Sequence, residues 1–268
     1  MARVPAVLTI AGSDSGGGAG IQADLKAFAA WGVHGLSAIA ALTAQNTVGV
    51  VAVHQVPPAF IVEQVRAVQD DIGVDAVKIG MLGTAATVAA VSQALDLLDA
   101  GTPVVIDPVM VSESGAELLD GDARNALVGL LLPRATVITP NLPEARVLAP
   151  DAEDLPRALH ALGPAYVVVT GGHRDEATDL FFDGDTLTAI PGPRHPDGAA
   201  HGSGCTHSSA LAAHLALGCT ALEAARAARD IASEAVRHGL RDIGQGPGPV
   251  DVLDVASRRP PTHARTLS

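Results

Sequence analysis

One stretch of the sequence combines an anion-binding turn with a reactive side chain: it reads His201-Gly-Ser-Gly-Cys-Thr206 and enters an Ala/Leu-rich run. The run predicts a buried helix, and the turn before it points free backbone N–H groups at one spot. The helix dipole makes that spot positive, so Gly202, Ser203 and Gly204 could hold an anion. Cys205 lies in the first turn, where a thiolate is stabilised, and we expect its pKa to fall. The same residues also fit an ordinary core helix with a buried cysteine.

Polar residues follow several short apolar runs elsewhere in the chain, and among them are Gln45, Asp107, Asn141 and Glu144. Asp107 and Glu144 could hold Mg²⁺ directly or through waters, because oxygen ligands suit that ion. Taken separately, each could instead cap or begin a helix; together with an anion-binding turn, they favour a magnesium-phosphate site. The amide of Gln45 could bind a planar ring through two hydrogen bonds, although such residues are also common in turns.

Strand-like apolar runs alternate with segments of helical periodicity through most of the chain. Strands are predicted over 7–11, 35–43, 50–56, 76–79, 104–106, 137–139 and 166–170, followed by a hairpin of 180–183 and 186–190. This alternation predicts an α/β fold with a mostly parallel sheet and helices on both faces, in which ligands bind beyond the carboxyl ends of the strands. Because no linker is visible, a single domain over 1–268 is predicted, with 258–268 as a frayed tail.

The first predicted strand runs into a glycine-rich loop, which reads Gly12-Ser-Asp-Ser-Gly-Gly-Gly-Ala-Gly20 and suits close approach of a ligand to the backbone. A helix is predicted after the loop, and Gly32 should end it. The loop is not a Walker A motif, because the chain contains no Gly-Lys-Ser/Thr. It also departs from a dinucleotide fingerprint, since Ile21 stands where a third glycine should follow Gly16 and Gly18.

Composition and charge exclude several classes of function. The formal net charge of −12 argues against nucleic acid or an anionic membrane as a partner. Two cysteines without a Cys-x-x-Cys pair disfavour a disulfide scaffold and a zinc knuckle, and they fit a reducing cytoplasm. We see no signal peptide and no apolar run long enough to cross a membrane. The sequence leaves the oligomeric state open, and a homodimer is one of the assemblies it allows.

The histidines and serines suggest two further functions, a metal site and a nucleophilic hydrolase, and the sequence supports both only weakly. The ten histidines form no His-Glu-x-x-His motif, and His207 and His214, a helical repeat apart, fit packing or surface positions better than a metal site. Serines near Cys205 could indicate a nucleophilic hydrolase. No Gly-x-Ser-x-Gly elbow is present, however, and the cysteine has no obvious base beside it in sequence.

Seven motifs in order resemble the hydroxymethylpyrimidine/phosphomethylpyrimidine kinases of thiamine synthesis, and together they span nearly the whole chain. They are Ala11-Gly-Ser-Asp-Ser-Gly-Gly-Gly-Ala-Gly-Ile-Gln-Ala-Asp-Leu-Lys26, Thr43-Ala-Gln-Asn-Thr47, Lys78-Ile-Gly-Met-Leu82, Asp107-Pro-Val-Met-Val111, Thr139-Pro-Asn-Leu-Pro-Glu144, His201-Gly-Ser-Gly-Cys-Thr206 and Gly244-Gln-Gly-Pro-Gly-Pro249. The resemblance implies a three-layer ribokinase-like fold and the cofactors ATP and Mg²⁺. It implies phosphorylation of a pyrimidine hydroxymethyl group, and then of the resulting monophosphate to the diphosphate.

The same resemblance assigns roles to individual residues. Cys205 takes the place of the catalytic base, and the anion hole matches Gly202, Ser203 and Gly204. The pyrimidine pocket matches Gly12, Asp24, Gln45, Met81 and Val109. The nucleotide site matches Asn141, Gly171, Gly172 and Arg174, and the metal site matches Asp107 and Glu144.

Three departures from the family pattern remove polar or cationic groups from the expected phosphate end: Glu113, Thr170, and the pair Ala199-Ala200. They bear on nucleotide affinity and on the second phosphorylation, although Arg174 could supply the charge lost at Thr170. Two alternatives therefore stay open. One is a pyridoxal or pyridoxine kinase of the same superfamily, and the other is a pyrimidine-binding protein with weakened catalysis.

Overall fold

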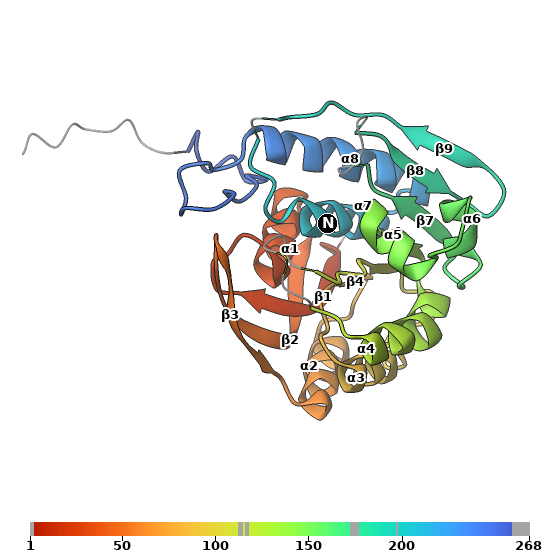
Figure 1. Ribbon diagram of the computed structural model, residues 1–268. Helices are drawn as coiled ribbons and strands as arrows, with labels where there is room; N and C mark the ends of the chain where they lie inside the picture. Colours follow the sequence, from red (N-terminus) through yellow and green to blue (C-terminus); the bar gives the residue numbers. More distant parts are fainter. Residues whose placement is uncertain (1–2, 112–114, 116–117, 172–176, 197, 259–268) are drawn as a thin grey trace, which may run out of the picture.

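A nine-stranded sheet forms the middle layer of the molecule (Figure 1). The computed structural model describes residues 3–111, 115, 118–171, 177–196 and 198–258. In spatial order, the strands are β3 (Gly49–Gln55), β2 (His34–Asn46), β1 (Ala6–Asp14), β4 (Ala76–Ile79), β5 (Val104–Ile106), β6 (Val137–Ile138), β7 (Tyr166–Val169), β8 (Asp179–Phe182) and β9 (Leu187–Ile190). The six neighbouring strands from β2 to β7 are parallel. At the edges, β3 pairs antiparallel with β2, β8 pairs antiparallel with β7, and β9 pairs antiparallel with β8.

Helices cover both faces of this sheet. Three helices pack on one face: α1 (Gly20–Ala30), α7 (Ser203–Ala216) and α8 (Ala221–Arg237). The other face carries α2 (Pro58–Asp71), α3 (Ala85–Leu95), α4 (Gly121–Ala126), a π-helical turn (Leu127–Leu131), a 3₁₀ turn (Leu132–Arg134), α5 (Leu142–Leu148) and α6 (Leu155–His160). In Figure 1, α7 and α8 lie on one side of the central strands and α2, α3 and α4 on the other, and the two packed faces give the molecule three layers.

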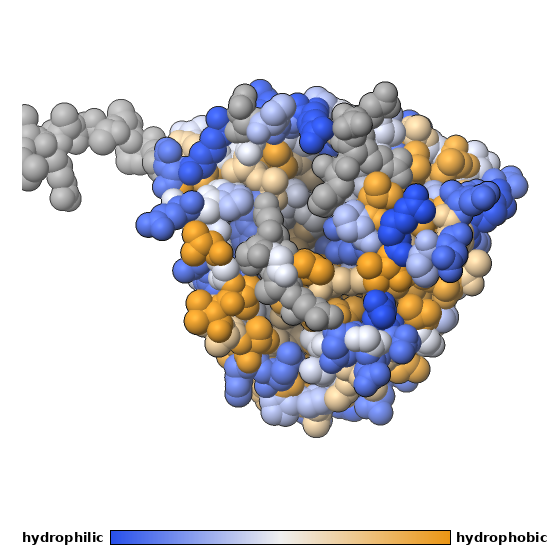
Figure 2. Space-filling model, in the orientation of Figure 1, coloured by the Kyte–Doolittle hydropathy of each residue, from blue (hydrophilic) through white to orange (hydrophobic). Residues whose placement is uncertain are grey.

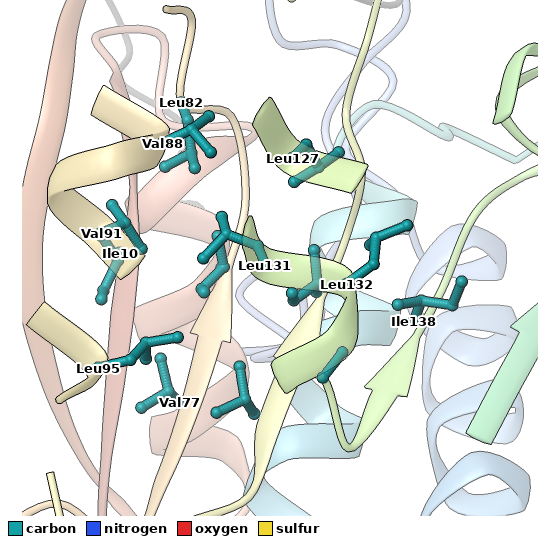
Figure 3. Packing of buried hydrophobic residues seen from close by; sticks show 14 of the residues in the cluster. Ile10, Val77, Leu82, Val88, Val91, Leu95, Leu127, Leu131, Leu132 and Ile138 are labelled. Atoms are coloured by element: carbon teal, nitrogen blue, oxygen red, sulfur yellow. The ribbon is translucent and has the colours of Figure 1, made fainter. Parts of the chain in front are cut away.

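Two hydrophobic clusters hold the layers together, one on each face of the sheet. Successive side chains of a strand point to opposite faces, so in β1 Leu8 and Ile10 join one cluster while Val7 joins the other. All three side chains are fully buried. Figure 3 shows the first cluster, in which Ile10 and Val77 of the sheet lie beside α3 and the helical turns near Leu131. Burial on both faces explains why the central strands read as continuous apolar runs.

The structure confirms the predicted α/β class and the mostly parallel sheet, and it corrects several boundaries. The first strand continues to Asp14, because residues 12–14 of the glycine loop still pair with β2. The second strand reaches Asn46, and the predicted strand 137–139 is shorter. Helix α1 ends before Gly32, whose φ of 69° is the left-handed conformation expected after a helix. Of the predicted frayed tail, 259–268 lies outside the described residues.

The antiparallel edge formed by β2 and β3 carries exposed apolar side chains, among them Leu42, Val51 and Val53. Hydrophobic residues gather over this region in Figure 2. Among the helices described, none is long and apolar enough to cross a membrane.

Candidate active site

A cavity of about 810 Å³ opens at the carboxyl ends of the parallel strands. Its walls include residues that end or follow these strands, namely Asp14, Asp107, Thr139 and Thr170, and the start of α7. Most of the residues predicted to bind ligands line it: Gly12, Gln45, Met81, Asp107, Val109, Asn141, Glu144, Gly202, Ser203, Gly204 and Cys205. The topology therefore brings together segments that are far apart in the sequence, as expected for ligand sites in open α/β sheets.

The predicted anion-binding turn begins α7. Gly202 caps the helix with a φ of 83°, and a Cβ at this position would lie 1.8 Å from the carbonyl oxygen of Gly18. Only glycine therefore fits at this position. The N–H groups of Gly204 and Cys205 lie in the first turn, where no acceptor exists within the helix, and both residues line the cavity. The turn can thus hold an anionic group of a ligand.

The prediction of a lowered pKa for Cys205 is wrong for the unliganded protein. Burial raises the pKa of its thiol to about 12, and the charges of Asp24 and Asp107 act in the same direction. The ammonium of Lys78 and a hydrogen bond with the Gly20 backbone favour the thiolate, but they do not outweigh the loss of hydration. Burial, which the local sequence does not show, is the largest influence on this thiol.

Asp107 and Glu144 both line the cavity, and both are buried carboxyl groups. Burial and the charge of Asp107 raise the pKa of Glu144 to about 8. Burial also raises the pKa of Asp107, although Lys78 and a hydrogen bond from Ser208 Oγ (3.1 Å) oppose this. A divalent cation between the two groups would relieve both effects, so these residues fit a metal site.

Glu144 also has the capping role that the sequence left as its alternative. Its Oε2 accepts a hydrogen bond from the Asn141 N–H (2.9 Å), and Asn141 Oδ1 accepts one from the Glu144 N–H (2.9 Å). The pair forms a capping box at the start of α5. The carboxyl group of Glu144 also has a hydrogen bond with the Met110 backbone, so a metal ligand role would be added to two existing hydrogen bonds.

Asp24 does not line the cavity, which corrects its predicted place in the pyrimidine pocket. The side chain is fully buried and forms an ion pair with Lys78, with Nζ–Oδ1 at 2.8 Å. Thr9 Oγ1 (2.6 Å) and Ser209 Oγ (2.7 Å) donate to the same carboxylate. Asp24 therefore influences the site through its ion pair with Lys78, which lines the cavity, and through its charge, which raises the pKa values of Cys205 and Asp107.

The pyrimidine side of the cavity contains the other residues assigned to it. The Gly12 N–H donates to the Met81 carbonyl (3.1 Å), and a Cβ on Gly12 would lie 2.5 Å from Met81 Cε. Glycine is thus required for the Met81 side chain to lie against β1. The Gln45 amide lies 3.2 Å from Thr43 Oγ1, whose hydroxyl also contacts the Ser13 carbonyl (2.9 Å), and Val109 adds an apolar wall.

The predicted nucleotide residues are only partly at the cavity. Asn141 lines the cavity, but Gly171 does not. The N–H of Gly171 donates to buried Asp179 (2.7 Å). Gly172 and Arg174 lie outside the described residues, as does Glu113. The cavity wall does include Thr170 and Ala200, whereas Ala199 is buried behind it.

The histidines behave as their sequence pattern indicated. His207 is buried and its Nε2 lies 3.1 Å from Asp179 Oδ2, whereas His214 packs against Trp31. Within the part of the chain that the structure describes, no three His, Cys, Asp or Glu residues are grouped to hold a metal ion. A metal at this site would therefore need oxygen ligands beyond Asp107 and Glu144, such as waters or phosphates.

Sequence reasoning placed Asp14 among the polar residues at the strand ends, without a specific role. It assigned no role to four other residues that the structure places at the cavity: Lys78, Asp179, His201 and Arg229. Lys78 left the clearest signal, because a lysine inside an apolar strand must have a buried partner. Asp14 and His201 were inside the recognised motifs, but their contact joins positions 187 residues apart. No local pattern could reveal it.

Comparisons with known proteins agree with this geometry. The family model described as phosphomethylpyrimidine kinase matches residues 14–251. A hydroxymethylpyrimidine/phosphomethylpyrimidine kinase of Rhizobium meliloti is 50% identical over 254 residues, covering 91% of this chain and 95% of the relative. One of the same name from Mycobacterium tuberculosis is 45% identical over 259 residues, covering 93% and 94%.

Two solved structures are similar over most of the chain. The pyridoxal kinase from Staphylococcus aureus in complex with ADP has a TM-score of 0.85 and 33% identity, covering 94% of each chain. The phosphomethylpyrimidine kinase from Clostridium difficile has a TM-score of 0.74 and 39% identity, covering 84% of this chain and 96% of the other.

Proposed function

This chain belongs to the phosphomethylpyrimidine kinase family, and we propose that it is an ATP-dependent kinase of thiamine biosynthesis. It phosphorylates the hydroxymethyl group of 4-amino-5-hydroxymethyl-2-methylpyrimidine, and then converts the monophosphate to the diphosphate. Its three-layer α/β structure is the ribokinase-like fold. The observation that carries the proposal is that the anion-binding turn, Cys205 and the carboxylate pair line one cavity with the pyrimidine residues.

Phosphoryl transfer depends mainly on alignment and on neutralising charge. We assign the first-turn N–H groups of Gly204 and Cys205 to the oxygens of the transferring phosphoryl group. Gln45 would bind the ring through its amide, with Met81 and Val109 packing against it. These contacts would direct the substrate hydroxyl toward the start of α7.

Asp107 and Glu144 are the residues we assign to Mg²⁺. They fit the ion because both are buried carboxyl groups whose pKa values are raised chiefly by burial, which a bound cation would oppose. When bound, Mg²⁺ would neutralise charge on the nucleotide phosphates. Asn141 would hold Glu144 in place through the capping box.

Cys205 is the proposed acceptor of the hydroxyl proton, as the resemblance implies. In the unliganded protein its thiol is protonated at neutral pH, because its pKa is about 12. It can accept a proton only after losing its own. Lys78 favours that loss and Asp107 opposes it, so the base role requires the charge of Asp107 to be compensated in the loaded enzyme.

Pyridoxal kinase activity is the second candidate, and the similarity to the Staphylococcus aureus pyridoxal kinase supports it. The two activities share the phosphate end of the site and differ in the ring that is bound. The proposal includes a reducing, cytoplasmic location, with which the two free cysteines are consistent. It also includes a homodimeric assembly.

Product analysis tests the proposed function. The protein is incubated with ATP and Mg²⁺ and with either the hydroxymethylpyrimidine, its monophosphate, or pyridoxal. We expect monophosphate and then diphosphate from the pyrimidine, with a higher kcat/KM than for pyridoxal. Preference for pyridoxal would favour the second candidate, and binding without turnover would indicate a protein that has lost catalysis.

A further inference from the structure

Asp14 closes the glycine-rich loop that follows β1. Its side chain is 3% exposed, and its Oδ1 accepts a hydrogen bond from the Gly16 N–H (2.7 Å). Its Oδ2 accepts two more, from the N–H groups of Gly18 (3.0 Å) and Ala19 (2.8 Å). A single carboxylate therefore determines the course of the loop up to the start of α1.

The same carboxylate connects the loop to the anion-binding turn. Asp14 Oδ2 lies 3.3 Å from His201 Nε2, and His201 directly precedes Gly202. The backbone of His201 is held from the other side, because its N–H donates to Gly248 (3.3 Å) and its carbonyl accepts from Val250 (3.1 Å). His201 is thus fixed by the C-terminal segment and in turn holds Asp14.

The loop and the turn also interlock sterically. A Cβ on Gly18 would lie 2.2 Å from His201 Cδ2, and a Cβ on Gly202 would lie 1.8 Å from the Gly18 carbonyl oxygen. Neither segment can move toward the other. The loop continues to Gly20, whose backbone hydrogen bonds with the Cys205 thiol. A shift of the loop would therefore change the surroundings of Cys205.

The contact depends on the negative charge of Asp14. Burial alone would raise the pKa of this carboxyl group, but the hydrogen bonds from His201 and the loop amides lower it below its usual value. The group is therefore ionised at neutral pH, and its hydrogen bonds are charge-assisted. An asparagine would keep the shape but would turn an NH₂ group toward backbone donors.

We propose that Asp14 and His201 are positioning residues for phosphoryl transfer. Their hydrogen bond holds the glycine loop against the turn that begins α7, and so sets the distance between the substrate hydroxyl and the anion-binding amides. This inference rests on the proposed function. Ser15 in the loop bonds the Gln45 carbonyl (2.7 Å) and N–H (2.8 Å), so the ring pocket touches the loop at one point. Loss of the contact should therefore lower kcat by a much larger factor than it changes the KM for the pyrimidine.

Three variants test the proposal in steady-state kinetics. His201→Leu removes the donor to Asp14, His201→Gln retains an N–H donor on a side chain of similar length, and Asp14→Asn removes the charge. Asp75→Asn is the matched control. Its carboxylate accepts from the Ala6 N–H (2.6 Å) at the opposite end of β1, and it does not line the cavity.

We expect His201→Leu and Asp14→Asn each to lower kcat at least tenfold, with KM changed less than threefold. His201→Gln should retain most of the activity, and Asp75→Asn should match the parent. The double variant Asp14→Asn/His201→Leu should be no worse than the poorer single variant, since both break one contact. Losses of kcat that multiply in the double variant, or equal losses in His201→Leu and His201→Gln, would overturn the proposal.

Amide hydrogen exchange gives a readout that needs no turnover. In His201→Leu, the amides of 16–19 should exchange faster while those of the central strands keep their protection. Unchanged exchange in the loop would contradict the Asp14–His201 contact itself. This outcome can be read even if the parent protein proves inactive on pyrimidines, because the measurement does not depend on the proposed function. If Asp14→Asn fails to fold, the two His201 variants still decide the question.

Discussion

Lys78 and Asp24 form an ion pair beneath the cavity, with Nζ–Oδ1 at 2.8 Å and both side chains fully buried. Burial alone would lower the pKa of Lys78, but the negative charge of Asp24 raises it above its usual value. Lys78 is therefore charged at neutral pH, although its side chain is fully buried. Removing one partner would leave the other charge buried and unpaired.

We expect Asp24→Asn and Lys78→Met each to destabilise the fold by about 3–5 kcal/mol, the usual cost of breaking a buried pair. Urea unfolding measures this, and the double variant should lose less than the sum of the two. Arg3→Met with Asp75→Asn provides an exposed-pair control, in which losses should be about 1 kcal/mol or less. A near-zero effect of Asp24→Asn would show that the pair contributes nothing to stability.

Glu144 should make both stability and Mg²⁺ binding depend on pH. Its folded pKa of about 8 lies above its ordinary value of 4.5, so the folded protein holds the proton more tightly than the unfolded chain. The stability from this group is fully present below pH 4.5 and is lost as the pH rises toward 8. Thermal unfolding should show this decline in the parent and a smaller decline in Glu144→Gln.

Added Mg²⁺ should raise the melting temperature more at pH 8 than at pH 6, because only the ionised carboxylate binds a cation well. Glu144→Gln should lose most of this difference. Glu153→Gln, which changes an exposed carboxylate after α5, is the control. If Mg²⁺ stabilises Glu144→Gln as it does the parent, then Glu144 is a helix cap and not a metal ligand.

Gln45→Ala should weaken binding of the pyrimidine far more than binding of ADP. Polar atoms of the ring would be left without a partner, at a cost of roughly 1–3 kcal/mol, or about five- to 150-fold in Kd. Calorimetry with each ligand measures the two effects. Gln93→Ala, on the exposed face of α3, is the control. Unchanged pyrimidine affinity in Gln45→Ala would remove this residue from the ring pocket.

Cys205→Ala should slow the first phosphorylation more than the second. The alcohol must lose a proton as it attacks, whereas the phosphate of the monophosphate is already largely ionised because its second pKa is about 6. Rates on the alcohol and on the monophosphate separate the steps, with Cys219→Ser as the control. Equal losses on both substrates would indicate that the cysteine only positions groups.

The raised pKa of Cys205 has a separate chemical consequence. Alkylation by iodoacetamide needs the thiolate, so in the unliganded protein it should be slow at pH 7 and accelerate as the pH rises. The measurement is made in Cys219→Ser, which leaves a single thiol. Rapid alkylation at pH 7 would instead support the low pKa of Cys205 that its place at the helix start predicts.

Thr170→Lys should speed the second phosphorylation more than the first. Thr170 lines the cavity where the family pattern has a lysine, and the second step brings more phosphate charge together. Thr188→Lys adds the same charge on β9, outside the cavity, and should change neither rate. The prediction is tested by kcat/KM on the alcohol and the monophosphate; equal changes on both would contradict it.

The sequence alone determined the features that depend on neighbouring residues in the chain. Short apolar runs, separated by segments of helical periodicity, predicted most strands of a parallel sheet. Burial on both faces of a strand requires such continuous hydrophobic segments. The turn at Gly202 and the start of α7 were likewise predictable, because a left-handed residue and a first-turn anion site are local properties. The motif order pointed to the family before any geometry was known.

Only the tertiary structure decided which charges meet and how deeply each is buried. The helix start predicted a low pKa for Cys205, but desolvation in the folded protein reverses it. The sequence resemblance placed Asp24 in the ring pocket. In the structure, its ion pair with Lys78, 54 residues away, holds it beneath the cavity. The contact of Asp14 with His201 spans 187 residues. Electrostatic interactions depend on distance in space and on exclusion of water, and neither is written in the local sequence.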